Sequence, residues 1–264
     1  MLATIKLIQT SAKQQLRYKT AMLGGMVTNF AWGIFRYYLV NAFYFKTTSI
    51  NGLSQQAAAT YVPLSQSLMV FLDTFGLMDI SQAVHRGEIG SMLLRPMSFI
   101  RYWVGYYCGR SLINLIIRGL ILYMGFSLIF PTIMPESLSQ WVLFLMSLML
   151  SWIISHLWII CINLSAFWLT DATGVLRLAF AMQQLLTGML FPLRLLPEWL
   201  RQLCYWTPFP SMMNTPIEIF TNSVAINEVL SLIFLQIIWA ALLYIITIIV
   251  YKAGIRRLGS VCKL

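Results

Sequence analysis

Ionisable and amide side chains lie inside apolar stretches of this sequence, where they cannot be ordinary surface groups. Such a group costs free energy in a bilayer, so it is usually paired or functional. Arg36 and Asp73 fall in consecutive apolar stretches. Adjacent antiparallel helices would bring them to similar depth, so we expect an ion pair that lowers the cost of burying both. Arg110, Asn114 and Arg118 follow at four-residue spacing, which places them on one broad helix face.

The two arginines of this face have different expected environments. Arg110 lies nearer the start of its stretch, and its long side chain can extend to the cytoplasmic headgroups. Arg118 lies deeper. For Arg118 the sequence leaves two interpretations open, a role facing a cavity or a partner subunit and a structural ion pair.

Motifs of known enzyme classes are missing from the sequence. There is no GxxxxGK[ST] phosphate loop, no HExxH helix and no GxSxG nucleophile turn. His85 and His156 are far apart in sequence and in predicted depth, and the four cysteines lack zinc or CxxC spacing. We therefore expect no catalytic site, no metal site and no cofactor in this chain.

Apolar runs occupy most of the 264 residues and must position these polar groups. Hydrophobic residues make up 59% of the chain and charged residues 10%, whereas a soluble domain has about 25% charged residues. A bilayer core of about 30 Å needs about 20 apolar residues per helix. The sequence predicts an all-α polytopic membrane protein with six transmembrane helices, at residues 22–45, 61–80, within 102–130, 141–169, 175–190 and 229–251.

The N-terminal residues 1–20 differ from the rest, which forms one transmembrane domain at 21–264. Apolar residues from Leu2 to Leu16 recur at helical spacing among lysines and an arginine. This pattern favours an amphipathic helix in the membrane interface, and the alternative is an ordinary basic flank. No compact apolar core precedes a small-residue cleavage site, so we expect no signal peptide.

Lysine and arginine are distributed unequally between alternate loops, which predicts the orientation. Lys46, Arg194 and Arg201 are the three basic residues of one set of loops. The other set contains twelve: Lys6, Lys13, Arg17, Lys19, Arg86, Arg95, Arg101, Arg177, Lys252, Arg256, Arg257 and Lys263. Both termini are therefore expected in the cytoplasm. The net charge of +10 then reflects topology, and we expect no nucleic-acid partner.

The loop at residues 81–101 is the most informative polar segment. Gly87 and Gly90 flank Glu88, and a short apolar helical turn runs on to Pro96. Such a segment could dock into a groove on a soluble partner, or it could be a solvated linker. Composition alone does not separate these two interpretations.

A proline-rich segment precedes the last predicted span. Pro192, Pro197, Pro208 and Pro210 prevent one continuous helix from crossing the membrane. Broken backbone at membrane depth needs other protein or a water-filled cavity to satisfy it. With the interface-seeking aromatics around Trp199, this predicts that residues 191–210 enter the outer leaflet and return as short helices.

Two motifs resemble those of the ABC-2 type transporter permeases, and the resemblance covers essentially the whole chain. The first is G-E-I-x-x-x-L-L-R-P at Gly87–Pro96, after the second predicted span. The second is G-x-x-F-P-x-x-x-L-P-x-W-L before the last span. Its residues are Gly188, Phe191, Pro192, Leu193, Leu196, Pro197, Trp199 and Leu200, followed by Pro208.

The resemblance implies a division of labour between subunits. Two permeases, identical or homologous, would assemble with two cytoplasmic ABC ATPase subunits, which bind ATP and Mg²⁺. The loop at 81–101 would be the coupling helix, and the outer segment would cap the pathway. A smaller contact would come from Asp171 and Arg177. The main coupling contact would use Arg86, Gly87, Glu88, Ile89, Leu93, Leu94, Arg95 and Pro96.

The function implied is that of the membrane subunit of an exporter in the cell membrane, in bacteria the cytoplasmic membrane. Its aromatic and methionine-rich spans suit lipids, hydrophobic peptides or drugs as substrates. Two alternatives stay open: a membrane-bound enzyme acting on lipid, and a channel or assembly subunit that is not coupled to ATP. Only the transporter interpretation requires a nucleotide-binding partner.

Overall fold

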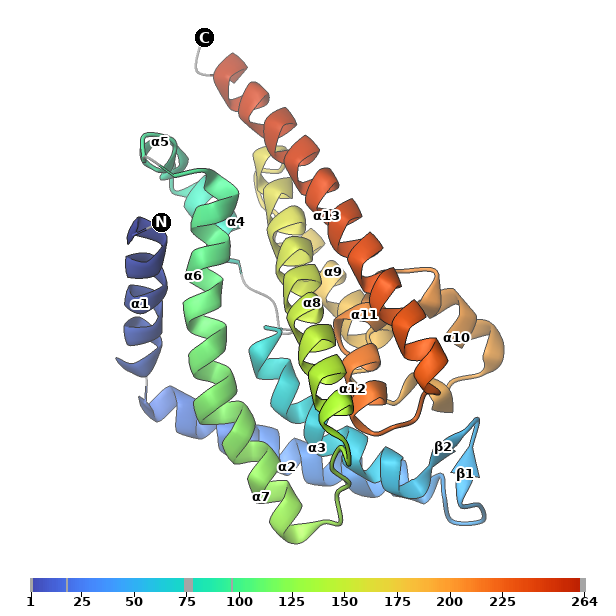
Figure 1. Cartoon of the computed structure of the whole chain (residues 1–264). Helices are drawn as coiled ribbons and strands as arrows, with labels where there is room; N and C mark the ends of the chain where they lie inside the picture. Colours follow the sequence, from blue (N-terminus) through green and yellow to red (C-terminus); the bar gives the residue numbers. More distant parts are fainter. Residues whose placement is uncertain (1, 18, 74–77, 96, 262–264) are drawn as a thin grey trace.

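A computed structural model describes residues 2–17, 19–73, 78–95 and 97–261 of the chain (Figure 1). Helices make up most of it. Their bounds are α1 (Leu2–Arg17), α2 (Lys19–Ala42), α3 (Gln55–Phe71), α4 (Asp79–His85), α5 (Ile89–Leu93), α6 (Phe99–Ile113), the π-helix η1 (Asn114–Gly119), α7 (Leu120–Ile129), α8 (Leu138–Asn163), η2 (Leu164–Phe167), α9 (Thr173–Leu186), η3 (Leu193–Leu195), α10 (Glu198–Tyr205), α11 (Phe209–Met212), α12 (Asn214–Phe220) and α13 (Ile226–Val261).

Three helices of the described chain are long and apolar enough to cross a membrane: Phe99–Ile129, Leu138–Phe167 and Ile226–Arg257. The other predicted spans fall short for identifiable reasons. Helix α2 has 24 residues but contains Asn29 and Arg36, and α3 has only 17 residues. Helix α9 has 14 residues, about 21 Å at 1.5 Å per residue. The membrane-protein class is supported, while the count of six crossings is not confirmed.

The predicted second span at 61–80 does not form one continuous helix. Helix α3 ends at Phe71, and Leu72 caps it by donating its N–H to the Leu68 carbonyl. The next residue, Asp73, has a φ of 50°, a left-handed conformation that helices do not continue through. The chain is described again from Met78, where α4 follows.

A small β-hairpin precedes α3, in a stretch for which the sequence predicted only polar character. Strands β1 (Ser49–Ile50) and β2 (Leu53–Ser54) pair antiparallel. Asn51 and Gly52 between them both have positive φ, as a two-residue hairpin turn requires. The Asn-Gly dipeptide was the signal that could have predicted this hairpin.

The two ends of the molecule carry different parts of the chain (Figure 1). The start of α1, the short helix α5 and the last turns of α13 lie at one end. The β1–β2 hairpin and the connection from α7 to α8 lie at the opposite end. This separation agrees with the two loop sets that differ in basic charge.

Helix α1 runs alongside α6 in the same direction (Figure 1). Its place in the membrane interface stays a prediction. Gly105 and Gly109 allow this close packing. A Cβ on Gly109 would lie 2.2 Å from the Ile8 carbonyl oxygen, and Ser11 Oγ donates to the Tyr106 carbonyl at 2.5 Å. Small residues four apart let two helix backbones approach, which explains the arrangement.

Candidate functional site

The motif glycine Gly87 forms the turn between α4 and α5. Its φ of 70° suits glycine, which has no Cβ to clash in the left-handed region. The Gly87 N–H donates to the Val84 carbonyl, and the Glu88 N–H donates to the Ala83 carbonyl, both at 3.0 Å. These bonds satisfy the last carbonyls of α4 and fix the direction in which α5 leaves.

Helix α5 has one buried side and one exposed side. Ile89 is 3% exposed and packs in a cluster with Phe99 and Trp103, so it anchors the segment and is not itself a free contact surface. Leu94 is 88% exposed. Glu88 is exposed as well, 4.0 Å from Arg86.

The remaining motif residues at this end are only partly described. Arg95 stacks its guanidinium 4.7 Å from the centre of the Tyr102 ring. Pro96 and the side chain of Leu93 lie outside the described residues.

The loop before α9 packs beside this segment. Asp171 Oδ1 accepts a 2.8 Å hydrogen bond from the Thr173 N–H. Hydrogen bonding to Thr173 lowers the pKa of Asp171, and the nearby His85 and Arg177 add to that shift. Ala172 and Leu176 are fully buried in the same cluster as Ile89. We call α4, α5 and this loop the docking face.

Arg177 is exposed on the first turns of α9. The sequence assigned it, with Asp171, to a second and smaller contact. Both side chains are exposed, and whether they contact a partner stays a prediction.

The second motif begins at Gly188, whose φ is 81°. A Cβ there would lie 2.5 Å from Tyr61 Oη. That hydroxyl lies 3.0 Å from both the Gly188 carbonyl oxygen and Asn214 Oδ1. The glycine therefore allows α3 and α12 to meet at the end of α9.

A salt bridge that the sequence did not predict holds the outer segment. Arg194 Nε lies 2.6 Å from Glu218 Oε1, and the Glu218 side chain is 3% exposed. Arg194 also donates to the Asn51 carbonyl, and the Asn51 amide donates to the Arg194 carbonyl. We call Asn51, Arg194 and Glu218 the outer latch, because it joins the β-hairpin, η3 and α12. A lone acid in the apolar run around Glu218 was the signal for it.

Short helices replace one continuous helix in the proline-rich stretch, as the prolines predict. Helix α10 has 8 residues, α11 has 4 and α12 has 7. Their depth in a membrane stays a prediction. Among the motif residues, Pro192 and Leu193 are buried, Phe191, Leu200 and Pro208 are half-buried, and Pro197 and Trp199 are exposed.

A cluster of polar groups joins the end of α3 to α4, α6 and α8; we call its five residues the Asp73 network. Asp73 Oδ2 lies 3.4 Å from His156 Nε2 and from Ser111 Oγ. Arg110 reaches Asp73 at 3.8 Å and Asp79 at 3.7 Å. Asp73 and His156 are 8% and 1% exposed, whereas Arg110 and Asp79 are 28% and 34% exposed. The network therefore has a buried centre and a partly exposed side.

The predicted ion pair between Arg36 and Asp73 is wrong. Arg36 donates instead to the Leu190 carbonyl at 3.0 Å and to Ser65 Oγ at 3.1 Å. Asp73 lies eight residues after Ser65, about 12 Å along a helix, and the left-handed turn there directs it toward α6 and α8. Its partners are His156, for which the sequence predicted no partner, and Arg110, whose side chain was expected to extend to the cytoplasmic headgroups.

Asn114 and Arg118 lie on the π-helix η1. Asn114 Oδ1 accepts a 3.0 Å hydrogen bond from Gln15 Nε2. Arg118 faces α2, where a Cβ on Gly25 would lie 2.7 Å from its Nη2. Among the residues that the structure describes, no carboxylate forms a salt bridge with Arg118, so the structural ion pair is not found there.

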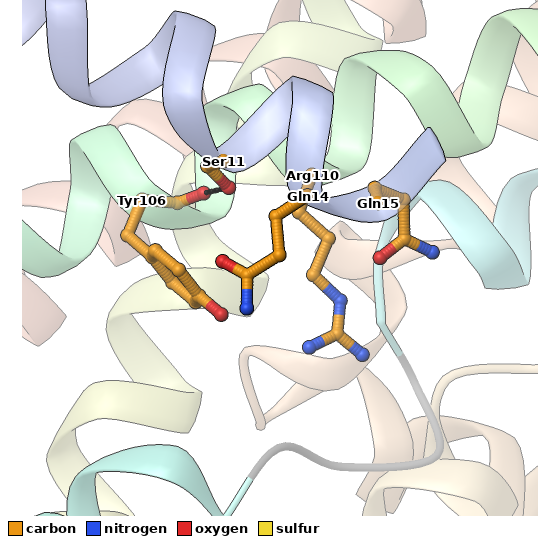
Figure 2. Close-up of a pocket in the computed structure, with 5 residues that line it drawn as sticks. All are labelled: Ser11, Gln14, Gln15, Tyr106 and Arg110. Carbon is orange, nitrogen blue, oxygen red and sulfur yellow. Dashed lines mark hydrogen bonds between the residues drawn. The ribbon is translucent and has the colours of Figure 1, made fainter. Parts of the chain in front are cut away.

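A polar groove of about 250 Å³ lies between α1 and α6 and is lined by Ser11, Gln14, Gln15, Tyr106 and Arg110. Figure 2 shows the side chains of Gln14, Gln15, Tyr106 and Arg110 projecting to the same side of the two helices. No sequence motif predicted this groove, because its residues come together only through the packing of α1 on α6.

Clusters of three or more His, Cys, Asp or Glu side chains that could hold a metal ion are absent from the described part of the chain. The Asp73 network combines a serine, a histidine and an aspartate, but both histidine nitrogens already face acceptors. Nδ1 lies 2.9 Å from the Trp152 carbonyl oxygen, and Nε2 faces Asp73. The arrangement therefore suits a structural role, in which these side chains hold α3, α6 and α8 together.

Comparison with known protein families gives a match over most of the chain. The sequence model of a family described as ABC-2 family transporter protein matches residues 30–261. A search of curated proteins finds no match. The matched range includes the docking face, the Asp73 network and the outer latch, and it begins after α1.

Proposed function

Because the chain belongs to the ABC-2 transporter family, we propose that it is the membrane-spanning permease subunit of an ATP-binding cassette exporter. Members of this family work with ABC ATPase subunits. The sequence has no phosphate-binding loop of its own, so ATP and Mg²⁺ are assigned to those partners. Transport across the membrane is this chain's contribution.

The docking face is proposed as the contact with the ATPase. Its support is the packing of two separate loops into one buried cluster around Ile89, Ala172 and Leu176. This base leaves Glu88 and Leu94 exposed on either side of α5, which lies at the same end of the molecule as the start of α1 and the last turns of α13 (Figure 1). A carboxylate can make charge-assisted hydrogen bonds, and an exposed leucine can supply an apolar anchor.

The functional unit proposed has two permeases and two ATPases, with both termini of each permease in the cytoplasm. In that assembly each permease crosses the membrane six times, and residues 191–210 lie in the outer leaflet. Shorter helices such as α3 and α9 would be covered by protein, which lowers the need for a full apolar span. The two permeases are identical or homologous chains.

Coupling would pass from the docking face to the spans through the Asp73 network. Asp79 is the first residue of α4, and Arg110 on α6 lies between Asp79 and Asp73. ATP binding would bring the docking faces of two permeases together and favour one of two transmembrane arrangements. The outer latch would hold the outer segment in its closed position during this cycle.

The substrate class proposed is hydrophobic: lipids, apolar peptides or drugs. Its support is the apolar and aromatic composition of the chain, with 14% aromatic residues. Export from the cell and residence in the cell membrane, which in bacteria is the cytoplasmic membrane, are further parts of this proposal, and the family match supports them.

The test is retention of the ATPase on affinity-tagged permease, measured with transport in proteoliposomes. Leu94→Asp and Glu88→Ala should leave the protein inserted but lower ATPase retention by about tenfold or more, the effect expected for an interface anchor. Glu136→Ala, an exposed acid in the loop between α7 and α8, is the matched control and should change little.

Two outcomes would contradict the proposal. Full ATPase retention and wild-type transport in the Leu94→Asp, Glu88→Ala double variant would make the docking face an inert linker. Transport without any nucleotide-binding partner would favour the channel interpretation instead.

A further inference from the structure

The guanidinium of Arg36 is buried in the protein without a counter-ion. The residue is 2% exposed, and its two hydrogen bonds go to neutral oxygens, the Leu190 carbonyl and Ser65 Oγ. Its Nη2 has no hydrogen-bond partner in the described part of the chain. A buried charge is costly unless it is paired, and the described state leaves that cost uncompensated.

Glu218 is the carboxylate that could pair with Arg36 in another state of the protein. All eight aspartates and glutamates of the chain lie within the described residues, and none of them forms a salt bridge with Arg36. Of these eight, Asp73 and Glu218 are buried. Asp73 is held by His156 and Arg110 in the Asp73 network, which leaves Glu218.

A buried tyrosine, Tyr61, connects the surroundings of Arg36 and Glu218. Its side chain lies within electrostatic range of both charges. Tyr61 Oη lies 3.0 Å from Asn214 Oδ1, and the Asn214 side chain also hydrogen-bonds to Glu218. Arg36 holds the Leu190 carbonyl, four residues before the arginine of the outer latch. The buried cation and the buried acid are therefore close, and polar groups fill the space between them.

We propose that Arg36 is a second partner of Glu218, and that the carboxylate passes from Arg194 to Arg36 when the outer latch opens. In the described state Glu218 pairs with Arg194 on η3, whose side chain is 20% exposed. An outward movement of the outer segment takes Arg194 with it and would leave a buried carboxylate alone, which is strongly unfavourable. Transfer to Arg36 pairs both buried charges at once, so it lowers the cost of opening. Arg36 is thus a positioning residue for the outer segment.

The exchange rests on the proposed function, because it assigns the opening of the outer latch to an export cycle. Its first test uses the permease alone, without ATPase or substrate. The exchange and the proposed function can therefore fail separately.

The first test is a double-mutant cycle on thermal unfolding of the purified full-length permease in detergent. Arg194→Gln leaves Arg36 as the only arginine available to Glu218. Adding Arg36→Gln should then lower the thermal midpoint by about 4 °C or more beyond the sum of the single effects.

Arg118→Gln is the matched control for this cycle. Arg118 is also an arginine of a predicted span without a salt bridge in the described part of the chain, but it lies on η1 beside Gly25. Combined with Arg194→Gln, it should be additive within about 1 °C. Additivity in the Arg36 cycle, or equal non-additivity in the Arg118 cycle, would overturn the proposal.

A transport measurement on the complete complex keeps the exchange falsifiable if Arg194→Gln does not fold. Arg36→Gln should slow transport in proteoliposomes about tenfold with unchanged ATPase retention, because the open state would leave Glu218 unpaired. Arg36→Lys keeps the charge and should stay within about threefold of the wild type. Equal losses in the lysine and glutamine variants would overturn the exchange, since Arg36 would then act only by holding the Leu190 carbonyl and Ser65.

Discussion

At the residue scale, the buried charges of this protein have partners on distant parts of the chain. Glu218 has Arg194, 24 residues earlier, and Asp73 has His156, 83 residues later. The sequence could mark these residues as unusual, because charges in apolar stretches need partners. It could not identify the partners, since that depends on which helices pack together. The wrong prediction that Arg36 pairs with Asp73 shows that recognising an unusual charge does not identify its partner.

The outer latch gives a first prediction at this scale. Glu218→Ala should lower the free energy of unfolding by about 2–3 kcal/mol, because Arg194 would be left half-buried without its partner. The value lies below that for a fully buried pair, since 20% of the Arg194 side chain is exposed. Thermal unfolding of the purified protein measures it.

The matched control for the latch is Glu198, which pairs with Arg201 on α10 but is itself 60% exposed, against 3% for Glu218. Glu198→Ala should change the free energy of unfolding by less than about 1 kcal/mol, as surface pairs do. Equal effects of the Glu218 and Glu198 variants would mean that the latch contributes no more than a surface pair.

The Asp73 network gives a second prediction, tested by a double-mutant cycle. Asp73→Asn and His156→Gln should be non-additive by about 1–2 kcal/mol, because the two side chains are in contact. Asp73→Asn combined with His85→Gln should be additive, since His85 is exposed on α4. Additivity in both cycles, again from thermal unfolding, would show that Asp73 and His156 are neighbours without energetic coupling.

At the element scale, local sequence signals explain much of the helix pattern. One long apolar run forms α6 and α7, and two others form α8 and α13. The prolines after Gly188 divide the outer segment into short helices. The Asn-Gly turn of the hairpin was also visible in the sequence. The course of α1 was not, because Gly105 and Gly109 acquire meaning only when another helix lies against them.

The packing of α1 on α6 gives a third prediction. Gly109→Leu should lower the free energy of unfolding by more than about 2 kcal/mol, because its Cβ would collide with the backbone of α1 at Ile8. Gly24→Leu is the matched control, since that helical glycine has no atom within 4 Å of a Cβ. Thermal midpoints compare the two, and a Gly109→Leu protein as stable as the wild type would show that α1 does not pack here.

At the scale of the whole molecule, the two ends of the protein carry different structural features. The docking face lies with the start of α1 and the last turns of α13, and the outer latch joins the hairpin of the opposite end to η3 and α12 (Figure 1). The Asp73 network connects the first residue of α4 to α6 and α8, in the part of the molecule between the docking face and the outer latch. The uneven distribution of basic residues predicted from the sequence that the two ends differ. The residues of the Asp73 network, through which motion would pass, could be identified only from the fold.

The most direct test of the central claim is the side of the membrane on which the docking face lies. Gly90→Cys and Asn51→Cys are made singly in a background without the four native cysteines, and intact cells are treated with a membrane-impermeant thiol reagent. The account predicts labelling of Asn51→Cys from outside, and of Gly90→Cys only after the cells are permeabilised. Labelling of Gly90→Cys in intact cells would contradict it, because a cytoplasmic ATPase could not reach that face.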